Sequence, residues 1–168
     1  MPRIFASLAI SELLLLTASA WLGVAGTAPR PDRHILLAVL SLLLSCLIQV
    51  VALTYLSVTG KMIAQAVHLG KLGLEPLEEA RRLKRSLTHA LAWVGASIAL
   101  VSASGGHHWR LADAPLIHFA AAGLLVTVHL CAYYREYDII VRNSRLLDGV
   151  LRRYNERRPS VVHPQDIG

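Results

Sequence analysis

The chain has 168 residues, enough for one domain, and 54% of them are hydrophobic, with a mean hydropathy of +0.48. This composition is too apolar for an ordinary soluble domain. The formal net charge of +6 comes from residues in the segments between apolar stretches, so it does not indicate a nucleic-acid partner.

Four long stretches contain almost no charged residues. Each is close to the ~20 residues that a helix needs to cross a ~30 Å hydrocarbon core. They predict an all-α integral membrane protein, a four-transmembrane-helix bundle with cytoplasmic helical extensions that forms one domain over residues 1–168. The predicted spans are 4–27, 35–58, 87–104 and 115–134.

Lysine and arginine are distributed unevenly around these spans. The first and third connections together hold three, whereas the N-terminus, the middle connection and the C-terminal part hold fourteen. The positive-inside rule therefore places both termini and the middle loop in the cytoplasm. We expect a protein of the bacterial inner-membrane type, surrounded by a lipid bilayer, with no nucleic-acid partner.

The first two predicted spans each carry a polar face. Glu12 shares its face with Ser19, Gly23 and Gly26, and small residues allow helices to approach closely in lipid, so Glu12 should point into the bundle. The second span has a polar face at helical spacing with Gln49 at its edge. Its members are His34, Ser41, Ser45, Ala52, Tyr55 and Thr59.

The middle of the chain is predicted to be a cytoplasmic loop over 61–85. Residues 62–67 continue an apolar helical face, Gly70 and Gly73 break it, and Pro76 begins a second short helix. The third span is rich in small residues at close-packing spacing. They are Ala92, Gly95, Ala96, Ala99 and Ala103.

The fourth span carries the most informative stripe of the chain. The helix is predicted to continue as a cytoplasmic extension over 135–155, whose apolar strip packs on 62–67 or on another subunit, before a loose tail at 157–168. At ~100° per residue, one narrow face combines two histidines with a carboxylate. Its members are His118, Ala122, Leu125, His129, Tyr133, Glu136 and Asn143.

Histidine side chains bind metals and haem iron, so we consider two kinds of site. A metal site at the outer face would use His34, His107, His108 and His118. For b-type haem, His118 and His129 are ~16 Å apart along a helix and could serve two stacked haems. His34 or His107 would be the outer partner and His89 the inner one. No CxxCH motif is present, which excludes covalent c-type haem.

Ionisable groups inside a membrane are expensive, which makes them candidates for function. A possible proton relay consists of Glu12, Tyr55, His129 and Glu136. Hydrogen bonds from His129 to Glu12 or Tyr55 could equally serve only to join helices. Cys46 and Cys131 fit no disulfide or metal pattern and are expected to be packing residues.

Three functions remain open on this basis. The first is a redox or metal-handling protein with a metal ion or b-type haem. The second is a non-catalytic accessory subunit of a larger membrane complex, and the third is an oligomeric proton- or ion-coupled transporter. Whether the protein is an enzyme is undecided, because no phosphate-binding glycine loop, GxSxG or HExxH motif is present. We expect homo-oligomers or partner membrane subunits in each case.

Overall fold

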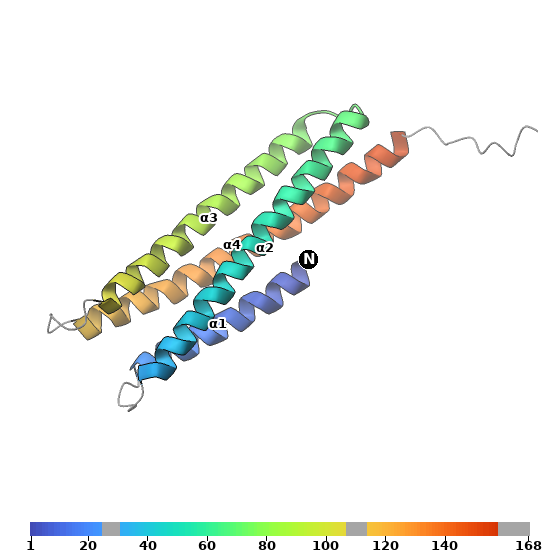
Figure 1. The fold of residues 1–168 in the computed structure, drawn as a ribbon. Coiled ribbons are helices and arrows are strands. Elements are labelled where there is room, and N and C mark those ends of the chain that lie inside the picture. Colours follow the sequence, from blue (N-terminus) through green and yellow to red (C-terminus); the bar gives the residue numbers. More distant parts are fainter. Residues whose placement is uncertain (25–30, 107–113, 158–168) are drawn as a thin grey trace, which may run out of the picture.

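The computed structural model describes residues 1–24, 31–106 and 114–157. These residues form four α-helices and no strand: α1 (Pro2–Val24), α2 (Pro31–Leu69), α3 (Glu75–Gly106) and α4 (Ala114–Arg157). The helices run alternately up and down along one long axis (Figure 1). The predicted all-helical class is therefore confirmed.

All four helices are long and apolar enough to cross a membrane. With 23 residues, α1 is about 34 Å long, close to the thickness of a hydrocarbon core. With 39 and 44 residues, α2 and α4 are about 58 and 66 Å long. The predicted extensions are thus direct continuations of the apolar helices.

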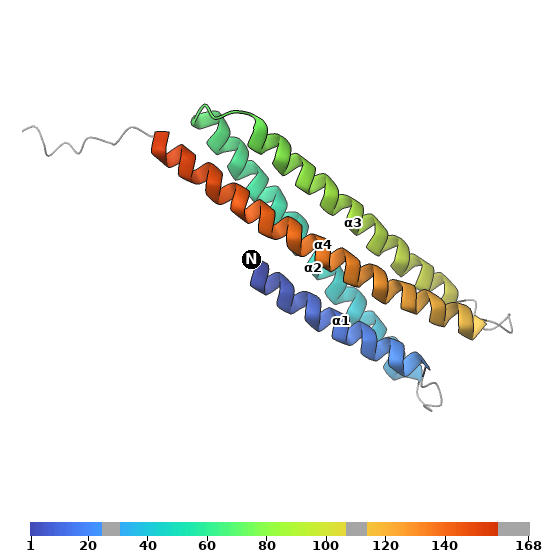
Figure 2. The same ribbon diagram turned by 180° about the vertical axis from the view of Figure 1, so that it is seen from behind.

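The two long helices α2 and α4 pack against each other, and the other two lie on either side of them. α1 packs on both α2 and α4, and α3 also packs on both, but within the described residues α1 and α3 do not pack together. The N-terminus lies near the middle of the bundle (Figures 1 and 2). One half of the bundle therefore has four helices and the other has three. We refer to the half that contains α1 as the predicted outer half.

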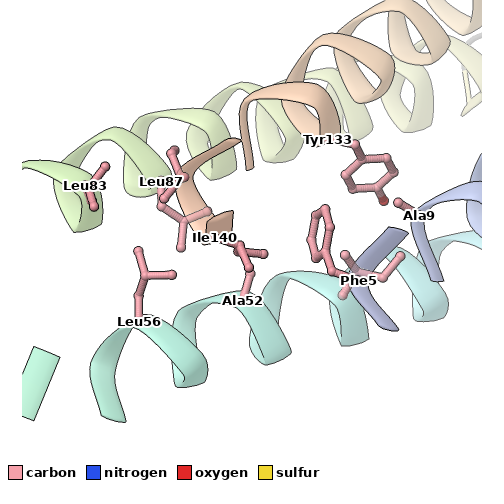
Figure 3. Packing of buried hydrophobic residues seen from close by; sticks show 10 residues of the cluster. Phe5, Ala9, Ala52, Leu56, Leu83, Leu87, Tyr133 and Ile140 are labelled. Carbon is pink, nitrogen blue, oxygen red and sulfur yellow. The ribbon is translucent and has the colours of Figure 1, made fainter. Parts of the chain in front are cut away.

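The largest apolar cluster lies where the N-terminal part of α1 meets the three longer helices (Figure 3). Phe5 of α1 is 1% exposed and meets the ring of Tyr133 edge to face, with ring centroids 6.1 Å apart. Ala52 of α2, Leu87 of α3 and Ile140 of α4 are further members of the cluster. This cluster fixes the relative positions of all four helices just beyond the polar interior described below.

A second apolar cluster holds the three-helix half together. Ile63 and Val67 of α2, Ala80 of α3 and Val150 of α4 are buried against one another. The prediction that the strip on the last helix packs on 62–67 is confirmed. The region 61–85 is mostly helical, since only residues 70–74 lie between α2 and α3.

The end of α2 has a Schellman-type hydrogen-bond pattern. The Leu72 amide donates to the Val67 carbonyl at 3.0 Å, and Lys71 adopts a positive φ of 47°. The residue in the left-handed conformation is therefore Lys71, and neither Gly70 nor Gly73, which were expected to break the helix, has a positive φ. Gly70 is required for another reason, because a Cβ there would lie 2.9 Å from the Ala66 carbonyl oxygen.

The prediction of close packing through the small residues of α3 is wrong within this chain. That face is exposed, whereas the larger side chains of Leu87 and Val94 point to the neighbouring helices and fill the core. The exposed members are Ala92, Gly95, Ala96, Ala99 and Ala103.

Candidate functional site

The interior of the bundle contains an unusual number of polar side chains for an apolar protein. Most come from the polar faces predicted for α1, α2 and α4, and the expectation that Glu12 points into the bundle is confirmed. Among the described residues, no lysine, arginine or aspartate is buried with them. The buried polar residues are Glu12, Ser19, Ser41, Ser45, Gln49, Thr59, Ser97, His129, Glu136 and Asn143.

Glu12 lies near the middle of α1 and is 1% exposed. Its Oε1 accepts a hydrogen bond of 3.1 Å from the Ser41 hydroxyl on α2. The same oxygen lies 3.9 Å from Nε2 of His129 on α4. Its Oε2 is buried and has no hydrogen-bond partner in the described part of the chain.

His129 of α4 has both ring nitrogens engaged. Nδ1 lies 3.0 Å from the Leu125 carbonyl, which can only accept, so Nδ1 carries the hydrogen. In the neutral ring Nε2 then accepts from the Ser45 hydroxyl at 3.2 Å. The Tyr133 hydroxyl in turn donates to Ser45 Oγ at 3.5 Å. These bonds link Tyr133, Ser45 and His129 into one chain.

A second carboxyl group lies further along α4. Glu136 is 0% exposed, and neither of its oxygens has a hydrogen-bond partner among the described residues. The side chain of Gln49 on α2 lies near the Glu136 carboxyl group, but no hydrogen bond of ordinary length joins Gln49 to Glu136. Tyr133, on the same helix as Glu136, lies close enough to both Glu12 and Glu136 for their charges to affect its hydroxyl.

We call the buried polar side chains that lead from Glu12 to Glu136 the interior polar column. It runs from the predicted outer half toward the three-helix half, where Asn143 donates a 2.7 Å hydrogen bond to Thr59. The column consists of Glu12, Ser41, Ser45, Gln49, His129, Tyr133 and Glu136.

Two further histidines approach each other nearer the outer end of the bundle. His34 Nδ1 donates to the Ser19 carbonyl at 2.9 Å. The Ser104 hydroxyl donates its hydrogen to the Val101 carbonyl. His118 Nδ1, 3.1 Å from the Ser104 oxygen, is therefore the donor to Ser104. The His34 and His118 rings are nearly perpendicular, with centroids 6.3 Å apart. Gly23 leaves room for His34, since a Cβ there would lie 3.1 Å from its Cε1.

A cavity of about 420 Å³ connects these two groups of residues. Glu12, Ser41, Ser45 and His129 line one end of it, and we call these four residues the cavity floor. His34 and His118 line the other end, and the walls between are mainly aliphatic side chains. All four helices contribute residues to the lining.

The predicted ligand residues are only partly brought together. His34, His118 and His129 line one cavity, whereas His89 is exposed on α3, and His107 and His108 lie outside the described residues. Within the described residues there is no group of three or more His, Cys, Asp or Glu side chains able to hold a metal ion. Haem or metal ligation by His129 would also require it to leave Ser45.

The predicted relay is changed in its membership. Glu12 and His129 are neighbours, and Glu136 lies two turns further along α4. Tyr55 is half-buried and packs beside the apolar cluster, whereas Tyr133 donates to Ser45, the hydrogen-bond partner of His129. Ser41, Ser45 and Gln49 were visible on the polar stripe of α2, but the sequence could not show which residues they face.

No protein-family model matches the chain, and no curated protein or solved structure is significantly similar to it. The function is therefore argued from the geometry of the described residues.

Proposed function

We propose that the protein spans a membrane and transfers protons through the interior polar column, as a proton- or ion-coupled transporter. The observation that carries this proposal is the burial of Glu12 and Glu136 with no buried lysine or arginine among the described residues. As an oligomer, the protein could use the exposed small-residue face of α3, where another membrane helix could pack closely.

The physical basis is charge balance. An ionised carboxylate in an apolar interior is very unfavourable unless a counter-charge is close by. His129 is the nearest basic group to Glu12, and when its ring is neutral, with the hydrogen on Nδ1 bonded to Leu125, it carries no charge to balance the carboxylate. Each of the two buried carboxyl groups therefore needs a bound proton or another cation beside it. A change in the charge of the carboxyl group requires that this proton or cation be released or taken up.

The geometry supplies a short step for such an exchange. A proton on Glu12 can pass to His129 Nε2, which lies 3.9 Å away, once the two side chains move into hydrogen-bond contact and the Ser45 hydroxyl turns its hydrogen aside. Nδ1 keeps its hydrogen on the Leu125 carbonyl, so the product is an imidazolium beside a carboxylate. Ser45 and Tyr133 then provide hydroxyl groups in the direction of Glu136.

Infrared difference spectra of the detergent-purified protein between alkaline and acidic buffer test this chemistry. A protonated carboxyl with few hydrogen bonds absorbs at higher frequency than a solvated one. We expect such a high-frequency carbonyl band to change with pH in the wild type and to lose intensity in Glu12→Gln. Glu156→Gln, which removes a largely exposed carboxylate, should leave it unchanged. A spectrum in which Glu12→Gln matches the wild type would refute the assignment.

A second candidate function is favoured by the approach of His34 and His118. In the neutral histidine with its hydrogen on Nδ1, the lone pair lies on Nε2, and anchoring of Nδ1 is typical of histidines that bind metals or haem iron. The candidate is a redox or metal-handling protein in which these two residues are ligands. It predicts a Soret band, or near-stoichiometric metal, that His118→Ala abolishes while the bundle stays folded. Colourless, metal-free protein would eliminate it.

A further inference from the structure

The cavity between the histidine end and the interior polar column opens to the side of the bundle. α2 and α3 lie close together near their connection and separate toward the other end (Figure 1). Ile35, Val39 and Leu42 on α2 line the cavity and are 57%, 48% and 39% exposed. Val126 of α4 forms part of the opposite wall. In a membrane this opening would face the hydrocarbon region, from which an apolar molecule could enter.

The floor of the cavity has the opposite character. The Glu12 carboxyl is 1% exposed, lines the cavity, and has one oxygen without a hydrogen-bond partner in the described chain. Beside it are the hydroxyl oxygens of Ser41 and Ser45. No lysine or arginine lies among the lining residues that are described. The floor is therefore rich in oxygen acceptors and has no fixed positive charge.

We infer that this cavity binds a lipophilic organic cation, whose charged centre lies against Glu12 and whose apolar body lies against the aliphatic walls. The inference rests on the proposed function, because Glu12 must release its proton when the cation binds. The volume of about 420 Å³ is within the range of ordinary small-molecule sites.

A cation fits this cavity better than a neutral amphipathic molecule such as a quinone. A neutral ligand can accept or donate a hydrogen bond at the floor, but it cannot replace the proton of Glu12 as the counter-charge of that carboxylate. A cation balances that charge, and it does so without requiring aromatic side chains, of which the cavity lining has none besides its histidines. Lipid-facing walls favour a cation with a large apolar body over a hydrated metal ion.

Binding should then compete with protonation of Glu12. The titratable groups around that carboxyl are His129 and Tyr133 on α4, with His118 on α4 and His34 on α2 at the far end of the cavity. α3 contributes only Ile98, Val101 and Ser102 to the lining. Acidification adds a proton to Glu12, which removes the negative charge that holds the cation.

Calorimetric titration of the full-length protein in detergent with tetraphenylphosphonium tests the inference. We expect saturable binding that weakens on acidification and falls by at least about tenfold in Glu12→Gln. Glu136→Gln removes the other buried carboxyl, which does not line the cavity, and should bind like the wild type. Ala122→Phe keeps Glu12 but fills the half-buried cavity wall, and should also lose binding.

Absence of tetraphenylphosphonium binding, or equal binding by Glu12→Gln, would overturn the inference. Binding of the neutral decylubiquinone that depends on Glu12, without binding of the cation, would overturn it as well. The infrared carboxyl band separates the two proposals. A titrating Glu12 band without cation binding removes only the cation site, whereas Glu12-dependent cation binding without such a band removes only the proton-transfer proposal.

Discussion

Ser45 is the residue that joins the polar face of α2 to the histidine of α4. Its hydroxyl is 3.2 Å from His129 Nε2 and accepts from Tyr133. Ser45→Ala leaves that nitrogen without its donor in an apolar interior. We expect a loss of about 1 kcal/mol in the free energy of unfolding, because buried polar groups between membrane helices contribute modestly.

The measurement is reversible unfolding in mixed detergent followed by circular dichroism. Ser11→Ala is the matched control, since Ser11 is exposed and bonds only within its own helix. An unfolding free energy for Ser45→Ala equal to that of Ser11→Ala would show that the hydroxyl does not connect the helices.

The sequence predicted which residues point inward, but only partly which residues meet. Helical spacing alone put Glu12 on a face expected to point inward and put His129 and Glu136 on one shared stripe, and each of the three is 1% exposed or less. Which residues meet across two helices depends on how far one helix is shifted along its axis relative to the other. The spacing of residues within one helix gives no information about that shift. For this reason Tyr55 was expected beside His129, whereas the structure has Tyr133 and Ser45 there.

Whole helices were predicted more reliably than their ends. The four apolar stretches became α1 to α4 and α4 continues as the predicted extension, but α2 and α3 include most of the region 61–85 that was predicted to be a loop. The short helix that was predicted to begin at Pro76 is instead the start of α3, which has Glu75 and Glu78 in its first turn. An amphipathic segment that follows an apolar span can continue the same helix without a break. A hydropathy pattern does not distinguish such a continuation from a loop.

Two helices carry natural reporters of membrane burial. Cys46 of α2 and Cys131 of α4 are free and exposed on the surface of the bundle. Their neighbours Leu47 and Leu130 are apolar and also exposed, at 51% and 57%. If these faces contact lipid, a charged maleimide should not react with either cysteine in permeabilised membranes, but should label both after denaturation in dodecyl sulfate.

A cysteine introduced at the exposed Glu156 provides the positive control and should react in both conditions. Labelling of Cys46 or Cys131 in native membranes at the rate of this control would show that the corresponding helix is not in the hydrocarbon region. The experiment therefore tests membrane insertion separately from any transport activity.

At the scale of the whole molecule, the bundle is built with two unequal halves. The half with α1 contains the cavity and Glu12, and the half without it is closed by an apolar cluster around Ile63 and Val150. Glu136 and Tyr133 lie between them, close to the apolar cluster around Phe5. The interior therefore has an open half and a closed half, an arrangement that suits the proposed passage of protons.

Proton uptake by reconstituted vesicles tests that account most directly. Vesicles with a trapped pH-sensitive dye are given an inside-negative potassium diffusion potential, and the rate of internal acidification is measured. We expect the wild type and Glu156→Gln to acidify faster than protein-free vesicles, and Glu12→Gln and Glu136→Gln to fall to the protein-free rate. A wild-type rate equal to that of protein-free vesicles, or an undiminished rate in Glu12→Gln, would contradict proton transfer through the interior polar column.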